Sequence, residues 1–299
     1  MMTVYREIFC QSACNHLNSR RLPYHWDLNV YRGCTHGCRY CFAMYSHKYM
    51  GSDAFFGEVF VKINIVEQLE RLLRSPKWNR EAINLGGITD NYQHAEARYQ
   101  LMPEILKLLI RYQTPCMISS KSALILRDYD LIDELSRLAY VNIAQTITCA
   151  DERVRRKLEP GGAPSAKRFE VLKAFRRTNA SVGVHLMPIV PLLSDDPENL
   201  EAVYAAAKDC GAHYVLPCLM NLRGPTKNAF FRFLLAEYPD LAQPMSQLYA
   251  GGRLDPKYRK PVYETLFRLQ KTYGLGTRYG EAMRMRLPKQ ETYQQLSLF

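Results

Sequence analysis

Short apolar segments alternate with longer amphipathic segments along most of this chain. Six of the apolar segments are rich in strand-forming residues, and each ends in Gly, Cys or polar residues. The predicted strands are 27–31, 81–86, 115–119, 141–147, 181–190 and 213–219, and the predicted helices are 60–74, 97–112, 128–138, 165–178 and 197–209. This alternation indicates a parallel α/β sheet with right-handed crossovers, either open or curled toward a barrel.

The segments that flank the repeat divide the chain into three parts. We interpret residues 1–26 as an N-terminal extension, 27–225 as the α/β core, and 226–299 as a helical, basic C-terminal region with an exposed tail. The sequence Asn-Leu-Arg-Gly-Pro at 221–225 interrupts the repeat near the second boundary. Barrels and doubly wound sheets carry their chemistry at the carboxyl ends of the strands, so we expect the site there.

Composition narrows the class of protein. Hydrophobic residues make up 47% of the 299, and no apolar run approaches eighteen residues, which is typical of a soluble protein and predicts no membrane partner. Forty Lys and Arg against 29 Asp and Glu give a formal charge of +11, which favours encounter with a polyanion. Nine cysteines without a secretory leader predict a reducing, cytoplasmic compartment.

Three of the nine cysteines are clustered directly after the first predicted strand. Cys34, Cys38 and Cys41 have the spacing C-x3-C-x2-C within RGCTHGCRYCFA, a loop that contains two glycines. Three thiolates on so short a loop suit three corners of a cubane iron–sulfur cluster and leave one iron open to a ligand. A zinc site that includes His36 is an alternative, but the position of His36 between two cysteines makes tetrahedral ligation awkward.

With this loop the chain resembles the radical S-adenosylmethionine (SAM) superfamily, whose cysteine loop follows the first strand of a partial (β/α)6 barrel. Tyr40 and Phe42, on either side of the last cysteine, match the usual loop of that family. The blocks 29–43, 87–99, 119–128, 148–169 and 185–195 resemble the spore photoproduct lyase-related branch, whose members are often labelled DNA repair photolyases. The resemblance implies a partial (β/α)6 TIM-type barrel with a [4Fe–4S] cluster and SAM as cofactors.

The same resemblance implies roles for individual residues. Cys34, Cys38 and Cys41 would be the cluster ligands. The residues implied to bind SAM are Tyr40, Gly86, Gly87, Ser119, Ser120, Lys121, Gln145, His185 and Met187. The ammonium of Lys121 is expected near the SAM carboxylate, and glycine at 86–87 permits a close backbone approach to the methionine amino group. Thr146, next to Gln145, is expected near the site as well, but strand alternation places only one residue of each neighbouring pair inward. Ordinary turns, caps or core packing are the alternatives.

Hydrogen transfer is where the chain departs from spore photoproduct lyase. In radical SAM enzymes one electron cleaves SAM, and the 5′-deoxyadenosyl radical abstracts hydrogen from a substrate. Spore photoproduct lyase has a donor cysteine just after the second strand, whereas this chain reads NLGGITDNYQ there. The difference argues against the spore thymine lesion as substrate. We nominate Cys149, Tyr92 and Tyr99 for hydrogen transfer, with core packing as the alternative for Cys149.

The C-terminal region is both basic and aromatic. Between Arg253 and Lys289 there are ten Lys or Arg and three Asp or Glu. The interleaved rings are Tyr258, Tyr263, Phe267, Tyr273 and Tyr279. This pattern is typical of surfaces that neutralise phosphates and stack bases, and the alternative is a helix that packs its rings on the barrel. A second basic run, 153–157, leads into LEPGGAP.

The chain ends in a short motif of its own. Gln295, Leu296, Ser297, Leu298 and Phe299 resemble the QL(S/D)LF peptide by which bacterial DNA polymerases and repair proteins dock on the sliding clamp. The alternative is a tail that folds onto its own domain.

The combined features predict a radical SAM enzyme that acts on a DNA base in the manner of a photoproduct lyase. Its expected partners are DNA and an electron donor such as flavodoxin or ferredoxin. Radical chemistry on an RNA base, a peptide or a small metabolite is the alternative within the same class. A non-catalytic iron–sulfur adaptor that binds nucleic acid is the alternative from another class.

Overall fold

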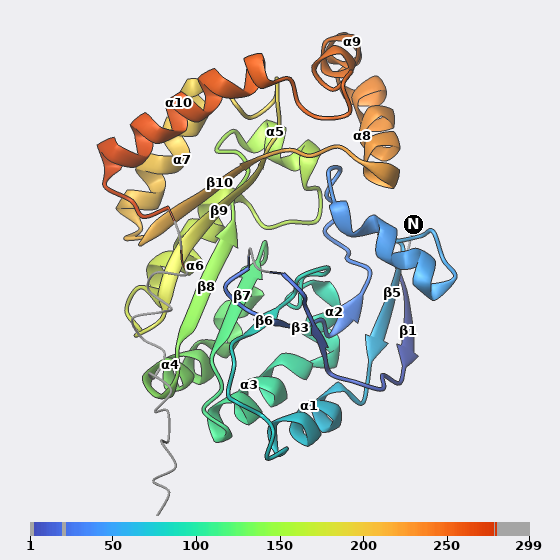
Figure 1. The fold of residues 1–299 in the computed structure, drawn as a ribbon, viewed down its shortest axis with the longest axis vertical. Coiled ribbons are helices and arrows are strands. Elements are labelled where there is room, and N and C mark those ends of the chain that lie inside the picture. The colour runs from blue at the N-terminus through green and yellow to red at the C-terminus, as the bar shows by residue number, and fades with distance from the viewer. Residues whose placement is uncertain (1–2, 20–21, 278, 280–299) are drawn as a thin grey trace, which may run out of the picture.

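The computed structural model describes residues 3–19, 22–277 and 279, and its central feature is a seven-stranded sheet. The strand order is β10-β9-β8-β7-β6-β3-β2. The six parallel strands are β3 (Trp26–Leu28), β6 (Ile83–Leu85), β7 (Cys116–Ser120), β8 (Val141–Thr146), β9 (Ser181–Ile189) and β10 (Tyr214–Leu219). Figure 1 shows this sheet curving with helices along its outer side. The six predicted strands and the α/β partial barrel are confirmed.

The alternation of side chains along the strands separates two faces of the sheet. Leu85, Ile118, Ile143 and Val182 are register neighbours and belong to the main hydrophobic core. Asn84, Met117, Asn142 and Ser181, one position earlier on the same strands, form the row on the opposite face. The outer face is therefore aliphatic and packs on helices, while the concave face is largely polar.

The helices follow the predicted pattern with two differences. They are α1 (Ile65–Leu73), α2 (His94–Tyr99), α3 (Leu101–Arg111), α4 (Tyr129–Leu138), α5 (Glu152–Leu158), α6 (Ser165–Phe175) and α7 (Pro197–Asp209). The helix predicted over 97–112 is interrupted at Gln100, whose φ is 50°. The Glu96 carboxylate accepts hydrogen bonds from the backbone N–H groups of Leu101 and Met102, which caps α3 and favours a separate start there.

The second difference lies at the start of the helix predicted over 60–74. Residues Glu58–Lys62 form β5, which pairs in parallel with β1 (Val4–Ile8) and antiparallel with β4 (Tyr31–Arg32). Val59 and Val61 are fully buried in this small second sheet. The β-branched valines and the pairing with a distant segment favour a strand where the local apolar spacing suggested a helix.

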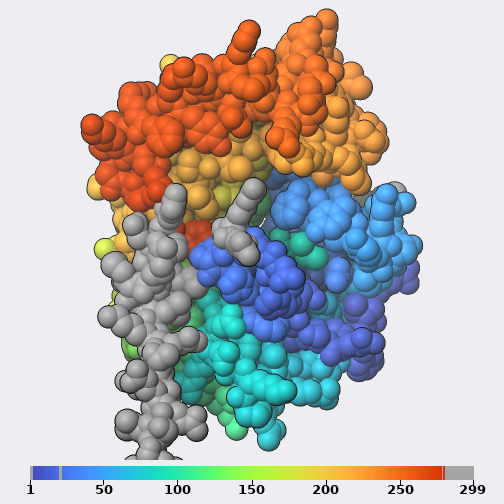
Figure 2. Space-filling model, in the orientation of Figure 1, coloured from blue at the N-terminus to red at the C-terminus, as the bar shows by residue number. Residues whose placement is uncertain are grey.

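The remaining elements extend the barrel at both ends of the sequence. β2 (Cys14–His16) joins the main sheet antiparallel to β3. Short helices η1 (Phe42–Met50) and η2 (Leu124–Asp128) follow the ends of β4 and β7, and α8 (Gly224–Glu237), α9 (Pro239–Leu248) and α10 (Pro256–Tyr273) follow β10. Figure 2 shows the orange and red C-terminal helices forming one end of the molecule. Among the described residues, no helix combines the length and apolarity that a membrane span requires.

Candidate active site

The cysteine loop leaves the main sheet at the carboxyl edge, just after β3 and β4. Gly33 and Gly37 have φ angles of +89° and +66°, a region that glycine adopts without strain. A Cβ atom on Gly33 would lie 2.3 Å from the carbonyl oxygen of Glu58, so a larger residue does not fit. The resulting turn buries the thiols of Cys34 and Cys38 and leaves Cys41 partly exposed.

Side chains from the segment after β6 hold this loop in place. Gln93 is fully buried, and its amide donates to the carbonyl oxygen of Gly33 at 2.9 Å. The Gln93 Oε1 atom accepts from the Thr35 backbone N–H at 3.0 Å. Thr89 also donates its hydroxyl to the Gly33 carbonyl, at 2.7 Å. Sequence reasoning missed this bracing role, and the signal that would have indicated it is the run of polar residues directly after a buried strand.

Asp90 is the centre of a buried hydrogen-bond network beneath the loop. Its Oδ2 atom lies 2.8 Å from His36 Nε2 and accepts from the Lys121 backbone N–H at 2.8 Å, and Ser120 Oγ donates to its Oδ1 at 2.9 Å. Burial raises the pKa of Asp90, but His36 and the hydrogen bonds outweigh it and lower the pKa to about 2. The other ring nitrogen of His36 lies 3.0 Å from the Gly161 carbonyl oxygen. Both nitrogens are therefore engaged, so His36 is not oriented as a zinc ligand.

A second buried network fixes Tyr40, between the last two cysteines. Tyr40 donates its hydroxyl to Glu159, and Thr148 donates to the same carboxylate at 2.8 Å. Glu159 is also paired with Arg168 at 2.5 Å, and neither side chain has exposed surface. Burial raises the pKa of Glu159, but Arg168 and Lys121 outweigh it and lower the pKa to about 2. The cysteine loop is thereby connected to the segment between α5 and α6.

Lys121 provides a positive charge beside this loop. Its Nζ atom lies 5.9 Å from the centroid of the Tyr40 ring. Burial lowers the pKa of Lys121, but Cys38 and Glu159 outweigh it, and the pKa is raised overall. Within the described part of the chain the ammonium forms no ion pair. A half-buried cation without a paired carboxylate is suited to bind an anionic group of a ligand.

Polar side chains on the concave face form a chain behind Lys121. Ser119 Oγ lies 3.3 Å from His185 Nδ1, and His185 Nε2 lies 3.5 Å from the Tyr214 hydroxyl. The Tyr214 hydroxyl accepts from the Asn142 amide at 2.9 Å. Burial, with a smaller contribution from Lys121, lowers the pKa of His185 to about 4. His185 is therefore neutral at physiological pH. Met187, two residues further along β9, lies on the same face.

The donor set fits an iron–sulfur group better than a single ion. Three thiols come from one loop, and the Lys121 cation opposes the effect of burial that raises the pKa of the Cys38 thiol to about 12. Among the described residues, no three His, Cys, Asp or Glu side chains are grouped as they would be around one metal ion. Three thiolates on one loop are the ligands that three corners of a cubane cluster require.

Comparison with known proteins decides the family. Residues 28–202, which include the cysteine loop and the four parallel strands β6 to β9, match the Radical SAM superfamily. The chain belongs to this superfamily. It is 36% identical over 277 residues to an uncharacterized protein of Mycobacterium tuberculosis, covering 91% of this chain and 81% of the relative. An uncharacterized protein of Methanocaldococcus jannaschii is 26% identical over 248 residues, with 83% and 90% covered.

Solved structures with a similar fold include spore photoproduct lyase. Its complex with dinucleoside spore photoproduct aligns with a TM-score of 0.64 at 13% identity, covering 90% of this chain and 79% of that one. A mutant of the lyase with bound AdoMet and the same dinucleoside aligns with a TM-score of 0.62 at 13% identity and the same coverage. At this identity the likeness concerns the fold. The expected resemblance of this chain to the spore photoproduct lyase-related branch of the superfamily is confirmed at the level of the fold.

The structure separates the residues expected to bind SAM into two groups. Tyr40, Lys121, Ser119, His185 and Met187 lie beside the cysteine loop or on the concave face. Gln145 does not, because the pleat of β8 turns it to the helix-packed face together with Ser120, its register neighbour on β7. Thr146, which pairs in register with His185, is the residue of β8 that faces inward. Of the expected pair Gln145 and Thr146, the pleat of β8 therefore favours Thr146 as the residue that lines the site.

Gly86 and Gly87 end β6 next to the polar end of β3. Gly86 has a φ of +98°. A Cβ atom on Gly87 would lie 2.5 Å from the Asp27 carboxylate, so glycine is required there by the protein itself. Asp27 is held by the amides of Asn29 and Asn84 at 2.6 and 2.7 Å. The turn keeps a rigid, close-packed backbone at the position where SAM binding was expected.

The three residues nominated for hydrogen transfer lie away from the concave face. Cys149 is fully buried, its thiol lies 3.3 Å from the Asn199 Oδ1 atom, and burial raises its pKa to about 12. Tyr92 is also buried and donates to Asp128 at 3.0 Å. The ring of Tyr99 packs against β1. These contacts pack the three residues within the protein, and their part in hydrogen transfer stays a prediction.

The basic, aromatic stretch after residue 253 is mostly turned toward the protein. Tyr258 bonds to Asp195, the Tyr273 ring packs on Tyr204, and the Tyr279 ring lies 5.8 Å from the His185 ring. Phe267 is the exception. Among the described rings of this stretch, it is the one that is strongly exposed, at 68%. Residues 280–299, which include the clamp-like motif, lie outside the described part of the chain.

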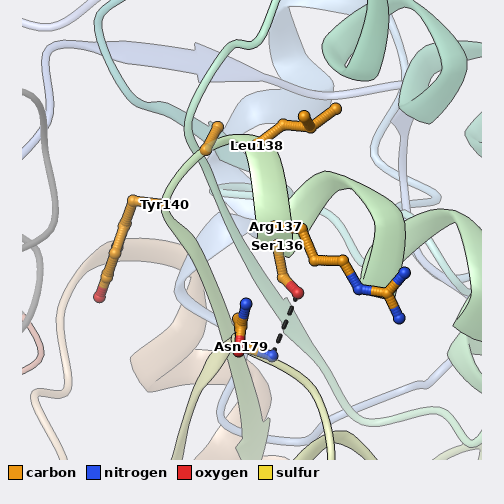
Figure 3. A pocket seen from close by; sticks show the side chains of 6 residues that line it. Ser136, Arg137, Leu138, Tyr140 and Asn179 are labelled. Carbon is orange, nitrogen blue, oxygen red and sulfur yellow. Dashed lines mark hydrogen bonds between the residues drawn. The ribbon is translucent and has the colours of Figure 1, made fainter.

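A depression elsewhere on the surface is not part of this site. It measures about 220 Å³ and is lined by residues 136–140 and Asn179, where α4 ends and β8 begins. Figure 3 shows Ser136 accepting a hydrogen bond from the backbone N–H of Asn179, at 3.2 Å. The depression therefore lies at the amino end of the strands, whereas the cysteine loop lies at the carboxyl end.

Proposed function

We propose that this chain is an enzyme that uses a [4Fe–4S] cluster to cleave SAM and that it acts on a base in DNA. The observation that carries the proposal is the loop with Cys34, Cys38 and Cys41, braced at the carboxyl edge of the barrel beside the unpaired Lys121 cation. When bound, the cluster supplies one electron that breaks the C5′–S bond of SAM, which leaves methionine and a 5′-deoxyadenosyl radical that takes hydrogen from the substrate.

In this proposal the residues of the chain bind and orient SAM and the substrate. Lys121 holds the carboxylate of SAM, and the backbone at Gly86 and Gly87 meets its amino group. His185 is neutral at physiological pH and offers hydrogen bonds to the substrate or cofactor without adding charge. Thr146 completes the inward-facing row. The buried networks around Asp90 and Glu159 keep the loop rigid, which preorganises the site and limits the access of water.

Three observations support DNA as the substrate. The fold is similar to that of spore photoproduct lyase, which has been solved with a dinucleoside photoproduct. The chain carries a formal charge of +11, which favours a polyanionic partner. The last five residues resemble a clamp-docking peptide of DNA polymerases and repair proteins. Because the segment directly after β6, GGITDNYQ, has no cysteine, a base lesion or modification other than the spore thymine product is the expected target.

The test is an anaerobic assay of the reconstituted protein. With dithionite and SAM, 5′-deoxyadenosine is expected to form, and photoproducts in UV-irradiated duplex DNA are expected to decline in the same tubes. Cys38→Ala should abolish both, whereas Cys116→Ala, a buried cysteine at the amino end of β7, should retain both. SAM cleavage with unchanged photoproducts would contradict the repair proposal and direct the search to RNA, peptides or metabolites. An intact reducible cluster without SAM cleavage would favour the adaptor.

Two partners belong to this proposal. Residues 295–299 dock on the bacterial sliding clamp, and an electron donor such as flavodoxin or ferredoxin reduces the cluster. A fluorescent peptide with the last ten residues should bind purified clamp, and the same peptide with Leu298 and Phe299 replaced by Ala should not. Equal binding of the two peptides would contradict the docking proposal. Reduced flavodoxin should replace dithionite in the SAM-cleavage assay, and a failure to do so would remove it as donor.

A further inference from the structure

Exposed aromatic rings lie directly next to the cysteine loop. η1 begins at Phe42, the residue after Cys41, and Phe42, Tyr45 and Tyr49 are 61%, 44% and 78% exposed. In a 3-10 helix residues three apart lie above one another, so Phe42, Tyr45 and the exposed Lys48 form one stripe, with Tyr49 adjacent to it. A run of large rings turned to solvent is unusual for a surface that has no partner.

The two segments around these rings, η1 and α8, carry mainly positive charge. η1 packs against α8, and the hydroxyl of Thr226 in α8 donates to the Cys41 carbonyl oxygen at 2.9 Å. Residues 28–52, which include η1, and 210–236, which include all of α8 except its last residue Glu237, contain six Lys or Arg and no Asp or Glu. In Figure 1 the blue coil of η1 lies beside α8 at the edge of the molecule, and Figure 2 shows both at the surface.

These charges have no counterions within the described protein. Lys48, Arg223, Lys227 and Arg232 are exposed and form no ion pair among the residues that the structure describes. The carboxylates that border the two segments are largely engaged elsewhere, since Glu58 is paired with Arg6 and Glu237 with Lys157 at 3.2 Å. Asp53 follows η1 and is the first acidic residue after it. The face formed by Phe42, Tyr45, Lys48, Tyr49, Arg223, Lys227 and Arg232 is named the η1–α8 face below.

We propose that the η1–α8 face binds a single-stranded segment of DNA, with phosphates on its Lys and Arg side chains and bases stacked on Tyr45 and Tyr49. Exposed rings among unpaired cations are the combination that binds single strands, because every base has a face to stack and every nucleotide has a charge. An acidic protein would satisfy the charges but would leave the stripe of rings without a specific role. The inference rests on the proposed function and places the unpaired part of the substrate beside the cluster ligands.

Fluorescence anisotropy of the reconstituted protein with a fluorescein-labelled twelve-residue oligodeoxythymidylate tests the inference. The double variant Tyr45→Ala, Tyr49→Ala should bind at least about tenfold more weakly, and Tyr45→Phe, Tyr49→Phe should bind like the original protein. Phe267→Ala is the matched control, because the exposure of Phe267, 68%, lies between those of Tyr45 and Tyr49, and Phe267 lies on α10. Lys48→Gln and Arg232→Gln should each lower the slope of log affinity against log salt by about 0.7. Iron content and absorbance show that each variant retains its cluster.

The outcomes separate this inference from the proposed function. Tight binding by the original protein and equally tight binding by the alanine variant would overturn the η1–α8 assignment and leave DNA as substrate. Absence of binding by the original protein would contradict both. If the alanine variant binds the oligonucleotide normally but is reduced more slowly by flavodoxin, the face is an electron-donor surface and the inference is wrong.

Discussion

Tyr40 donates a hydrogen bond to Glu159, a residue 119 positions further along the chain. Tyr40 stands between Cys38 and Cys41, so this bond ties the cysteine loop to the far side of the barrel. Glu159 is in turn paired with the fully buried Arg168 on α6. The loop is thus positioned by a buried ion pair as well as by its own glycines, and the stability of the pair and the retention of the cluster are expected to change together.

Glu159→Gln should destabilise the protein by about 3–5 kcal/mol, because it leaves the Arg168 guanidinium buried without a carboxylate. The free energy of unfolding in urea, measured under anaerobic conditions, gives the value, and iron content is expected to fall with it. Glu170→Gln on α6 is the control, since the exposed pair with Lys167 is worth at most about 1 kcal/mol. Similar losses of unfolding free energy in the two variants would show that the buried pair stabilises the protein no more than the exposed pair does.

Gly33→Ala should prevent the loop from closing, whereas Gly51→Ala should cost only about 1 kcal/mol. Both glycines have positive φ angles, of +89° and +67°, so the backbone penalty is shared. A Cβ atom on Gly33 would meet the Glu58 carbonyl oxygen at 2.3 Å, while one on Gly51 would meet nothing within 4 Å. Iron and sulfide per chain after reconstitution is the measurement. Full cluster loading in Gly33→Ala would mean that the backbone near β5 can move aside.

The protein should lose stability as the pH falls from 6.5 to 4, partly through His185. Its pKa is lowered to about 4, so in this window the unfolded chain takes up a proton that the folded chain does not. The expected loss from this group is about 2–3 kcal/mol, and it is absent above pH 7. His185→Gln should flatten the pH dependence of the free energy of unfolding, whereas His16→Gln, at an exposed position on β2, should leave it unchanged. An unaltered curve in His185→Gln would assign the loss to other groups.

Lys62→Met should stabilise the protein by about 1–2 kcal/mol at neutral pH. Lys62 on β5 is only 5% exposed, its ammonium forms no ion pair within the described residues, and burial lowers its pKa. Methionine keeps the length of the side chain without the charge. The midpoint of urea unfolding measures the effect, with Lys107→Met on α3, where the side chain is exposed, expected to change little. A large destabilisation by Lys62→Met would indicate that the ammonium is solvated or bound to a group outside the described residues.

The order of strands and helices could be predicted from local patterns, because hydrophobic periodicity reports which face of each segment is buried. The spacing of Cys34, Cys38 and Cys41 was equally informative, since ligands within eight residues need no distant partner to form one site. The helix expected at 60–74 was partly wrong because its first residues pair with β1, which lies more than fifty positions earlier. A local window contains no information about such pairing.

The contacts that hold the site together depend on the tertiary structure. His36 meets Asp90, and Tyr40 meets Glu159, only because the strands that carry these segments end at the same edge of the sheet. The pleat, not the type of residue, turns Thr146 inward and Gln145 outward. Sequence patterns therefore identified the chemistry of the cluster loop, whereas three-dimensional packing decided which polar side chains surround it, because burial and hydrogen bonding join residues that are far apart along the chain.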